Sequence, residues 1–172
     1  LGLGATGIYT IAFYFGTLIL VPMRTMGKIS SVVIAEAWKK DDRHTIMDIY
    51  TKSSLSLSVF GFLLFIGVWG NVDNIFHIVG QDYSTGKYVI LFIGLVNLTD
   101  TLLGVSPHII LNSIYYRWLS FLLFIFAGLL IITNIIFIPI YGITGAALAS
   151  FISKFIYNLL KYIFLYHKFR FQ

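Results

Sequence analysis

The stretch that decides the fold is Trp118–Ser153, WLSFLLFIFAGLLIITNIIFIPIYGITGAALASFIS, which contains no Asp, Glu, Lys or Arg in 36 consecutive residues. A single helix that spans a bilayer needs about 20 apolar residues. The stretch is therefore long enough for two membrane helices joined by a tight turn. Proline does not continue a helix and glycine adopts unusual backbone angles, so the sequence PIYG predicts this turn at 139–142.

The rest of the chain has the same apolar character. Hydrophobic residues make up 58% of the 172 residues and charged residues only 11%, whereas soluble domains carry about a quarter charged residues. These few charges cannot cover a water-facing surface, so the surface must face lipid. The net charge of +5 follows from basic membrane loops and does not indicate nucleic-acid binding.

Apolar runs bounded by charged or turn residues predict an all-α membrane protein with about five transmembrane helices. No polar linker divides the chain, so residues 1–172 are expected to form a single transmembrane domain. The connection 38–52 mixes charges of both signs with apolar residues, which predicts a short amphipathic element at the membrane surface. The predicted helices are 8–36, 53–70, 88–111, 118–138 and 143–166.

The basic residues between these helices predict the orientation. Successive connections alternate between the two sides of the membrane, and eight basic residues then fall on one side against Lys87 alone on the other. Such an excess in short loops marks the cytoplasmic side. We therefore expect the loops 37–52 and 112–118 and the C-terminus in the cytoplasm, and the loop 71–87 and the turn at 139–142 outside. The eight residues are Lys39, Lys40, Arg43, Lys52, Arg117, Lys161, Lys168 and Arg170.

Charged residues inside the predicted helices are the candidates for a substrate path, because a charge at the bilayer centre costs about 2.5 to 3.5 kcal/mol and usually faces a neighbour or a wet cavity. The candidates are Arg24, Lys28, Asp100 and Lys154. Asp100 and Lys154 lie about 16 to 18 Å into their helices at 1.5 Å per residue. Their similar depth predicts an ion pair between the third and fifth helices.

Helical spacing places these charges on polar stripes of three helices. For Lys28 and Lys161, the competing interpretation is that the side chain reaches the membrane interface or holds helices together. His108, next to Pro107, is interpreted as structural. The stripes are Thr10, Tyr14, Thr17, Arg24, Lys28 and Ser31 in the first helix, Asn97, Asp100, Gly104 and His108 in the third, and Ala147, Ser150, Lys154, Asn158 and Lys161 in the fifth.

The sequence shows no catalytic constellation. The chain has no Cys, and no two of its four histidines have metal-ligand spacing on a helix. The acidic pair Asp41 and Asp42 stands among basic residues, as in a solvated surface loop. We therefore expect no enzymatic activity, no metal site and no cofactor.

The segment 134–150, NIIFIPIYGITGAALAS, resembles the pattern N-x-x-x-I-P-x-Y-G-I-x-G-A-A-x-A-[ST] near the end of polysaccharide and O-antigen flippases of the multidrug/oligosaccharidyl-lipid/polysaccharide exporter superfamily. The segment 5–12, ATGIYTIA, resembles the family's x-x-G-I-Y-x-x-A start of the second helix of a six-helix lobe. Together the two matches span nearly the whole chain. Small residues in the first motif allow close helix packing.

The resemblance implies most of the C-terminal six-helix lobe of a twelve-helix alternating-access transporter in the bacterial cytoplasmic (inner) membrane. The chain would be a fragment that lacks the N-terminal lobe and the first helix of its own lobe. The implied substrate is an undecaprenyl-pyrophosphate-linked oligosaccharide, a precursor of O-antigen lipopolysaccharide, capsule or exopolysaccharide. The implied partners are this lipid, the membrane lipids and the N-terminal lobe. Arg24, Lys28 and Lys154 would then contact pyrophosphate or acidic sugars.

Two alternatives are weighed against the flippase. A drug or cation antiporter of the same superfamily would use a membrane carboxylate for ion coupling, for which Asp100 is the one deep candidate. An O-antigen polymerase, an enzyme, would need a large outward loop with acidic residues and arginine. The loop 71–87 offers Asp73, His77 and Asp82 but no Arg.

Overall fold

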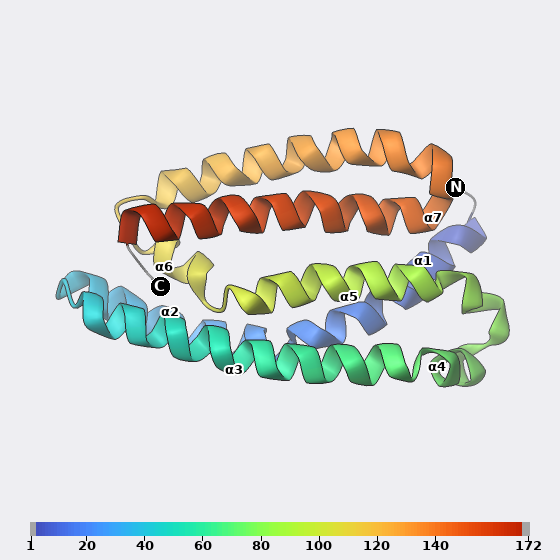
Figure 1. Cartoon of the computed structure of the whole chain (residues 1–172), viewed down its shortest axis with the longest axis horizontal. Coiled ribbons are helices and arrows are strands. Elements are labelled where there is room, and N and C mark those ends of the chain that lie inside the picture. The colour runs from blue at the N-terminus through green and yellow to red at the C-terminus, as the bar shows by residue number, and fades with distance from the viewer. Residues whose placement is uncertain (1–2, 170–172) are drawn as a thin grey trace.

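The computed structural model describes residues 3–169, which are helical along almost their whole length and contain no strand (Figure 1). The predicted all-α class is therefore confirmed. Arg170, one of the eight basic residues that set the orientation, lies outside the described residues. The elements in chain order are α1 (Leu3–Thr17), η1 (Leu18–Leu20), α2 (Val21–Lys39), α3 (Arg43–Gly70), α4 (Val72–Val79), η2 (Gln81–Gly86), α5 (Lys87–Leu102), α6 (Ser106–Leu111) and α7 (Tyr116–Phe169).

The first predicted helix is present as α1, η1 and α2, which follow one another without a loop. The short 3₁₀ turn η1 stands directly before Pro22, which lies in the first turn of α2. Proline has no N–H to donate and is tolerated in a first turn. The sequence thus tightens and restarts the helix at this point, just ahead of the predicted cations.

The connection between α2 and α3 is a tight turn, and the predicted surface element at 38–52 is wrong. Helix α3 already begins at Arg43, because the Asp42 side chain accepts a hydrogen bond from the backbone N–H of Thr45 at 3.0 Å and caps the helix. Asp41 makes the reversal with a φ of 50°. The charged segment therefore extends the second predicted helix by several turns.

The connection 71–87 is helical rather than an open loop. Helix α4 and the 3₁₀ turn η2 fill it, and Val72 and Phe76 of α4 are buried against the bundle. Lys87 forms an ion pair of 2.7 Å with Asp73. The apolar face of α4 anchors this connection against the ends of the neighbouring helices.

The predicted single helix 88–111 is broken into α5 and α6. Gly104 has a φ of +53°, which L side chains rarely adopt. A Cβ at this position would also stand 2.7 Å from the hydroxyl oxygens of Ser53 and Ser54 on α3. Close packing against α3 thus requires glycine at the break, and α6 leaves it in a new direction (Figure 1).

Helix α7 contains the predicted hairpin. Gly142, with φ 57° and ψ −130°, turns the chain back on itself, whereas Pro139 stays inside the preceding helical arm. The Thr133 hydroxyl lies 2.8 Å from that of Ser153, which shows that the two arms run antiparallel and in contact (Figure 1). A Cβ at Gly145 would meet the backbone carbonyl of Phe137, so the small-residue motif sets this close approach.

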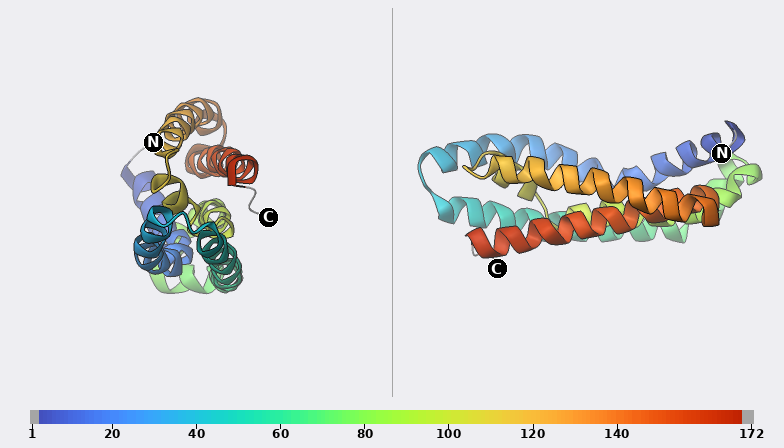
Figure 2. Two further views of the ribbon diagram at one scale, coloured as in Figure 1. Left: turned by 90° about the vertical axis from the view of Figure 1, so that its left-hand side faces the viewer. Right: turned by 90° about the horizontal axis from the view of Figure 1, so that it is seen from above.

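The long elements lie side by side in an elongated bundle, with α5 in contact with α1, α3 and α7 (Figure 2). The α2–α3 turn, the start of α7 and the C-terminal end of α7 lie at one end of the bundle. Helix α4 and the Gly142 turn lie at the other end (Figure 1). Successive connections thus lie at alternate ends of the bundle.

Within residues 3–169, three helices are long and apolar enough to cross a membrane: Gly4–Lys39, Arg43–Gly70 and Tyr116–Phe169. In the most apolar 18-residue stretch of each helix, only 11 to 17% of the residues are buried inside the bundle. Large hydrophobic side chains such as Phe124, Ile135 and Leu63 are exposed. An outer surface of this kind matches a lipid environment and not water.

Candidate functional site

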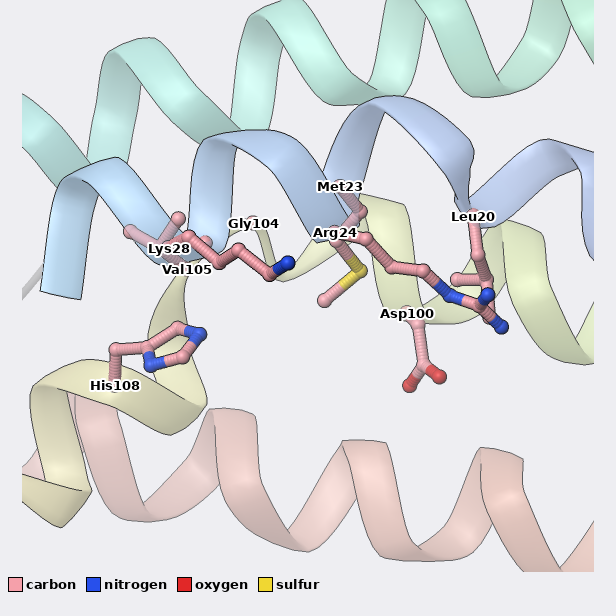
Figure 3. A pocket seen from close by; sticks show the side chains of 9 residues that line it. Leu20, Met23, Arg24, Lys28, Asp100, Gly104, Val105 and His108 are labelled. Atoms are coloured by element: carbon pink, nitrogen blue, oxygen red, sulfur yellow. The ribbon is translucent and has the colours of Figure 1, made fainter.

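A cavity of about 390 Å³ opens between α2 and the α5–α6 break. Val105, in its lining, belongs to a buried apolar cluster that also contains Ile34 and Ile109. Figure 3 shows the side chains that line it. They are Leu20, Met23, Arg24, Gly27, Lys28, Asp100, Gly104, Val105 and His108.

Three of the four predicted site residues, Arg24, Lys28 and Asp100, line this cavity. Arg24 and Lys28 are one helical turn apart on α2 and therefore share a face. Their side chains extend along the cavity in the same direction (Figure 3). Within residues 3–169 neither cation has a carboxylate within ion-pair distance.

The predicted ion pair between Asp100 and Lys154 is confirmed. Lys154 Nζ lies 3.2 Å from Asp100 Oδ2, and the exposed fractions of the two side chains are 23% and 14%. Asn158 Nδ2 donates to Asp100 Oδ1 at 2.9 Å and to Thr99 Oγ1 at 3.1 Å. The carboxylate thus points away from Arg24 and toward α7 (Figure 3), where its charge is balanced.

Aromatic rings surround the cation of this pair. Lys154 Nζ lies 5.4 Å and 5.1 Å from the ring centroids of Phe126 and Tyr157, within the range of a cation–π interaction. Both rings belong to α7, one from each arm. They hold the ammonium in place beside α5, so Lys154 completes the network without lining the cavity itself.

Lys161 was counted with the basic residues of the cytoplasmic side, with reaching the interface or holding helices together as the competing interpretation, and it lies inside the bundle and not at an interface. Its side chain is buried inside the bundle with 2% of the residue exposed. Nζ lies 4.9 Å from the Tyr157 ring centroid, and no carboxylate in the described part of the chain is within ion-pair distance. Lys161 therefore does not contribute to the surface charge at that end of the bundle.

His108 was interpreted as structural, and it lies in the wall of the cavity. Its ring stands on α6 across from Lys28 (Figure 3). Asn112 Nδ2 donates to the His108 carbonyl oxygen at 2.8 Å, which ties the end of α6. Gly27, on the facing side, leaves the space that the ring occupies: a Cβ there would be 2.8 Å from His108 Nε2.

Four further members of the predicted stripes pack between helices or bond to their own helix. Asn97 Nδ2 donates to the Gly16 carbonyl at 2.8 Å and joins α5 to α1. Thr10, Thr17 and Ser150 donate to carbonyls three or four residues earlier. These side chains do not extend the charged cavity.

The cavity lining can bind an anion. Two cations without ion-pair partners and one imidazole face the space, and the carboxylate at its edge is neutralised by Lys154. Arginine offers several donors in a planar fork and lysine a compact ammonium, and both are common ligands of phosphate. No group of three or more His, Asp or Glu side chains is placed for a metal ion among residues 3–169.

Sequence reasoning missed the apolar and glycine lining of this site. Leu20, Met23, Gly27 and Val105 line the cavity without any charge or motif to mark them. Gly27 carried one usable signal, its position between Arg24 and Lys28 on the polar stripe. Comparison of the chain with protein-family models, with curated proteins and with solved structures finds no match.

Proposed function

We propose that the chain is part of a membrane transporter that flips a lipid-linked anionic glycan precursor, an undecaprenyl-pyrophosphate-linked oligosaccharide, across the bacterial cytoplasmic membrane. The observation that carries the proposal is the pair Arg24 and Lys28, two cations without ion-pair partners in the described chain beside a cavity of about 390 Å³. Charged residues inside predicted membrane helices are costly in lipid and mark a substrate path. A pyrophosphate has the charge and the oxygens that such a pair binds.

In this proposal the chain crosses the membrane about five times. The crossings are α1–α2, α3, α5–α6 and the two arms of α7 on either side of Gly142. The end with the α2–α3 turn and the C-terminal end of α7 carries most of the exposed basic residues and is assigned to the cytoplasm. The cavity then lies within the membrane, between the two bilayer surfaces.

The antiporter of the same superfamily is the second candidate, favoured by the single deep carboxylate of Asp100. An ion-coupling carboxylate must be free to release and rebind its ion. Here both oxygens are engaged, Oδ2 by Lys154 and Oδ1 by Asn158. This arrangement supports a positioning role for Asp100 and favours the anionic substrate.

The test uses cells deleted for the full-length gene and complemented with variants. Arg24→Gln and Lys28→Gln should each lower flipping about tenfold, since a hydrogen bond to a charged group contributes about 1.5 to 3 kcal/mol. Lipid-linked oligosaccharide should accumulate on the cytoplasmic leaflet. Lys39→Gln is the matched control, because Lys39 is exposed near the α2–α3 turn.

Two outcomes would reject the proposal. Normal flipping in the double variant Arg24→Gln/Lys28→Gln, at a normal protein level, would show that the two cations of the cavity are not needed for transport. Normal flipping with shortened glycan chains after gene deletion would assign the protein to polymerisation instead of transport.

A further inference from the structure

The His108 imidazole lies in the cavity wall with no structural bond to explain its place there. Neither ring nitrogen makes a hydrogen bond within residues 3–169, although the residue is half-buried. A buried or half-buried polar group usually has a partner in the protein, in water or in a ligand. No hydrogen bond within the described residues thus competes with a ligand for the imidazole, whose Nε2 packs toward Gly27 of α2.

The charged groups around His108 come from three elements. Arg24 and Lys28 of α2 line the same cavity. Asp100 of α5 also lines it, but its carboxylate is bonded to Lys154 and Asn158 of α7. The field at the ring is thus set by two unpaired cations and a neutralised carboxylate. These surroundings attract an anion.

The packing against α2 fixes the ring position. Gly27 is buried, and a Cβ at this position would come within 2.8 Å of His108 Nε2. The contact atom is the far end of a side chain, so a methyl group would push the ring aside without moving either backbone. Gly27 therefore acts as a positioning residue for the imidazole.

We propose that His108 is the third ligand of the anionic group bound by Arg24 and Lys28, and that Gly27 holds it in position. The inference rests on the proposed function and specifies its headgroup site. Three donors on two facing elements match a pyrophosphate, which presents oxygens on two phosphorus atoms, better than a single phosphate. A protonated imidazole donates a hydrogen bond and adds a positive charge, so anion binding strengthens as the pH falls and His108 takes up a proton.

The test measures binding of geranylgeranyl pyrophosphate, inorganic pyrophosphate and inorganic phosphate to the full chain in detergent micelles. His108→Gln should weaken pyrophosphate binding roughly tenfold at pH 6 and less at pH 8, as expected for loss of a charged hydrogen bond. Any change in the charge of the ligand with pH affects both proteins equally. It therefore cancels in the ratio of the wild-type affinity to the His108→Gln affinity. His77→Gln is the matched control and should change neither affinity, because the exposed His77 lies on α4 at the other end of the bundle.

A double-mutant cycle separates this role from general packing. Gly27→Ala should weaken pyrophosphate binding about as much as His108→Ala, because both remove the ring from the site. In the His108→Ala background, Gly27→Ala should have no further effect on binding. Additive losses would overturn the positioning role of Gly27.

The outcomes distinguish the two proposals. Weaker binding in Arg24→Gln and Lys28→Gln with unchanged binding in His108→Gln would overturn the third ligand and leave the proposed function standing. No effect of any of the three would reject both. Tighter binding of geranylgeranyl pyrophosphate than of inorganic pyrophosphate supports a lipid headgroup, whereas equal affinities would overturn that assignment in favour of a free anion.

Discussion

Removing the cation of the Asp100–Lys154 pair should destabilise the bundle more than removing the anion. Lys154→Gln leaves a carboxylate that is 14% exposed with only the Asn158 amide as partner. Breaking a fully buried pair costs about 3 to 5 kcal/mol. The partial exposure here reduces this to about 2 to 3 kcal/mol.

Asp100→Asn should cost less, about 1 to 2 kcal/mol, because Lys154 keeps its cation–π contacts with Phe126 and Tyr157. In the double variant Asp100→Asn/Lys154→Gln, neither charge is left unpaired. Its loss should be close to that of Lys154→Gln alone, which gives a coupling energy of about 1 to 2 kcal/mol.

The assay is reversible unfolding of the full chain in mixed micelles, followed by circular dichroism. Both single variants and the double variant are measured under one condition, so the cycle depends only on differences. Strictly additive losses would show that the two side chains do not interact in the folded protein. A charge swap that restores no stability relative to the singles would refute the pairing in the same way.

Gly145→Ala should destabilise the α7 hairpin by about 1 to 3 kcal/mol, because the added Cβ would meet a carbonyl of the opposite arm. Gly128→Ala, whose added Cβ has nothing within 4 Å, is the control in the same unfolding assay. Lys161→Met should leave the free energy of unfolding unchanged or raise it by about 1 to 2 kcal/mol, because the buried ammonium has no carboxylate partner among the described residues. A lower free energy of unfolding would show that the charge has a structural role. The hydrogen bond from Thr45 lowers the pKa of Asp42 below its ordinary value, so the cap stabilises α3 above about pH 4 and is lost as the pH falls through the lowered pKa. Asp42→Asn, which keeps a cap oxygen, should remove this acid-dependent part of the melting temperature.

Two features of the fold were predicted correctly from the sequence. A charge-free run of 36 residues is too long for one membrane helix, and it contains the turn sequence PIYG. These two features predict a hairpin of two apolar helices. The ion pair between Asp100 and Lys154 followed from helix rise alone, because two opposite charges at equal depth in a bilayer lower each other's cost.

Other features were missed, some of them because they depend on neighbouring helices. The start of α3 at Arg43 was missed because a segment rich in both charges suggested a short amphipathic element at the membrane surface, whereas Lys52 and Asp48 pair four residues apart on one helix. The break at Gly104 follows from its contact with Ser53 and Ser54 of α3, which no local pattern reports. The same holds for His108, whose position depends on a glycine in a distant helix.

The direction of the Asp100 carboxylate determines what the cavity can bind. Asp100 and Arg24 line the same space, and an ion pair between them would leave Lys28 as the one uncompensated charge. Instead the Asp100 carboxylate contacts Lys154 and Asn158 of α7. Arg24 and Lys28 therefore have no ion-pair partner in the described chain and can both contact a ligand. In a medium of low dielectric constant each such charge acts strongly over several ångströms. The network on α7 therefore makes the cavity cationic although no residue of α7 lines it, and a change at Lys154 should weaken anion binding by freeing Asp100 to pair with Arg24.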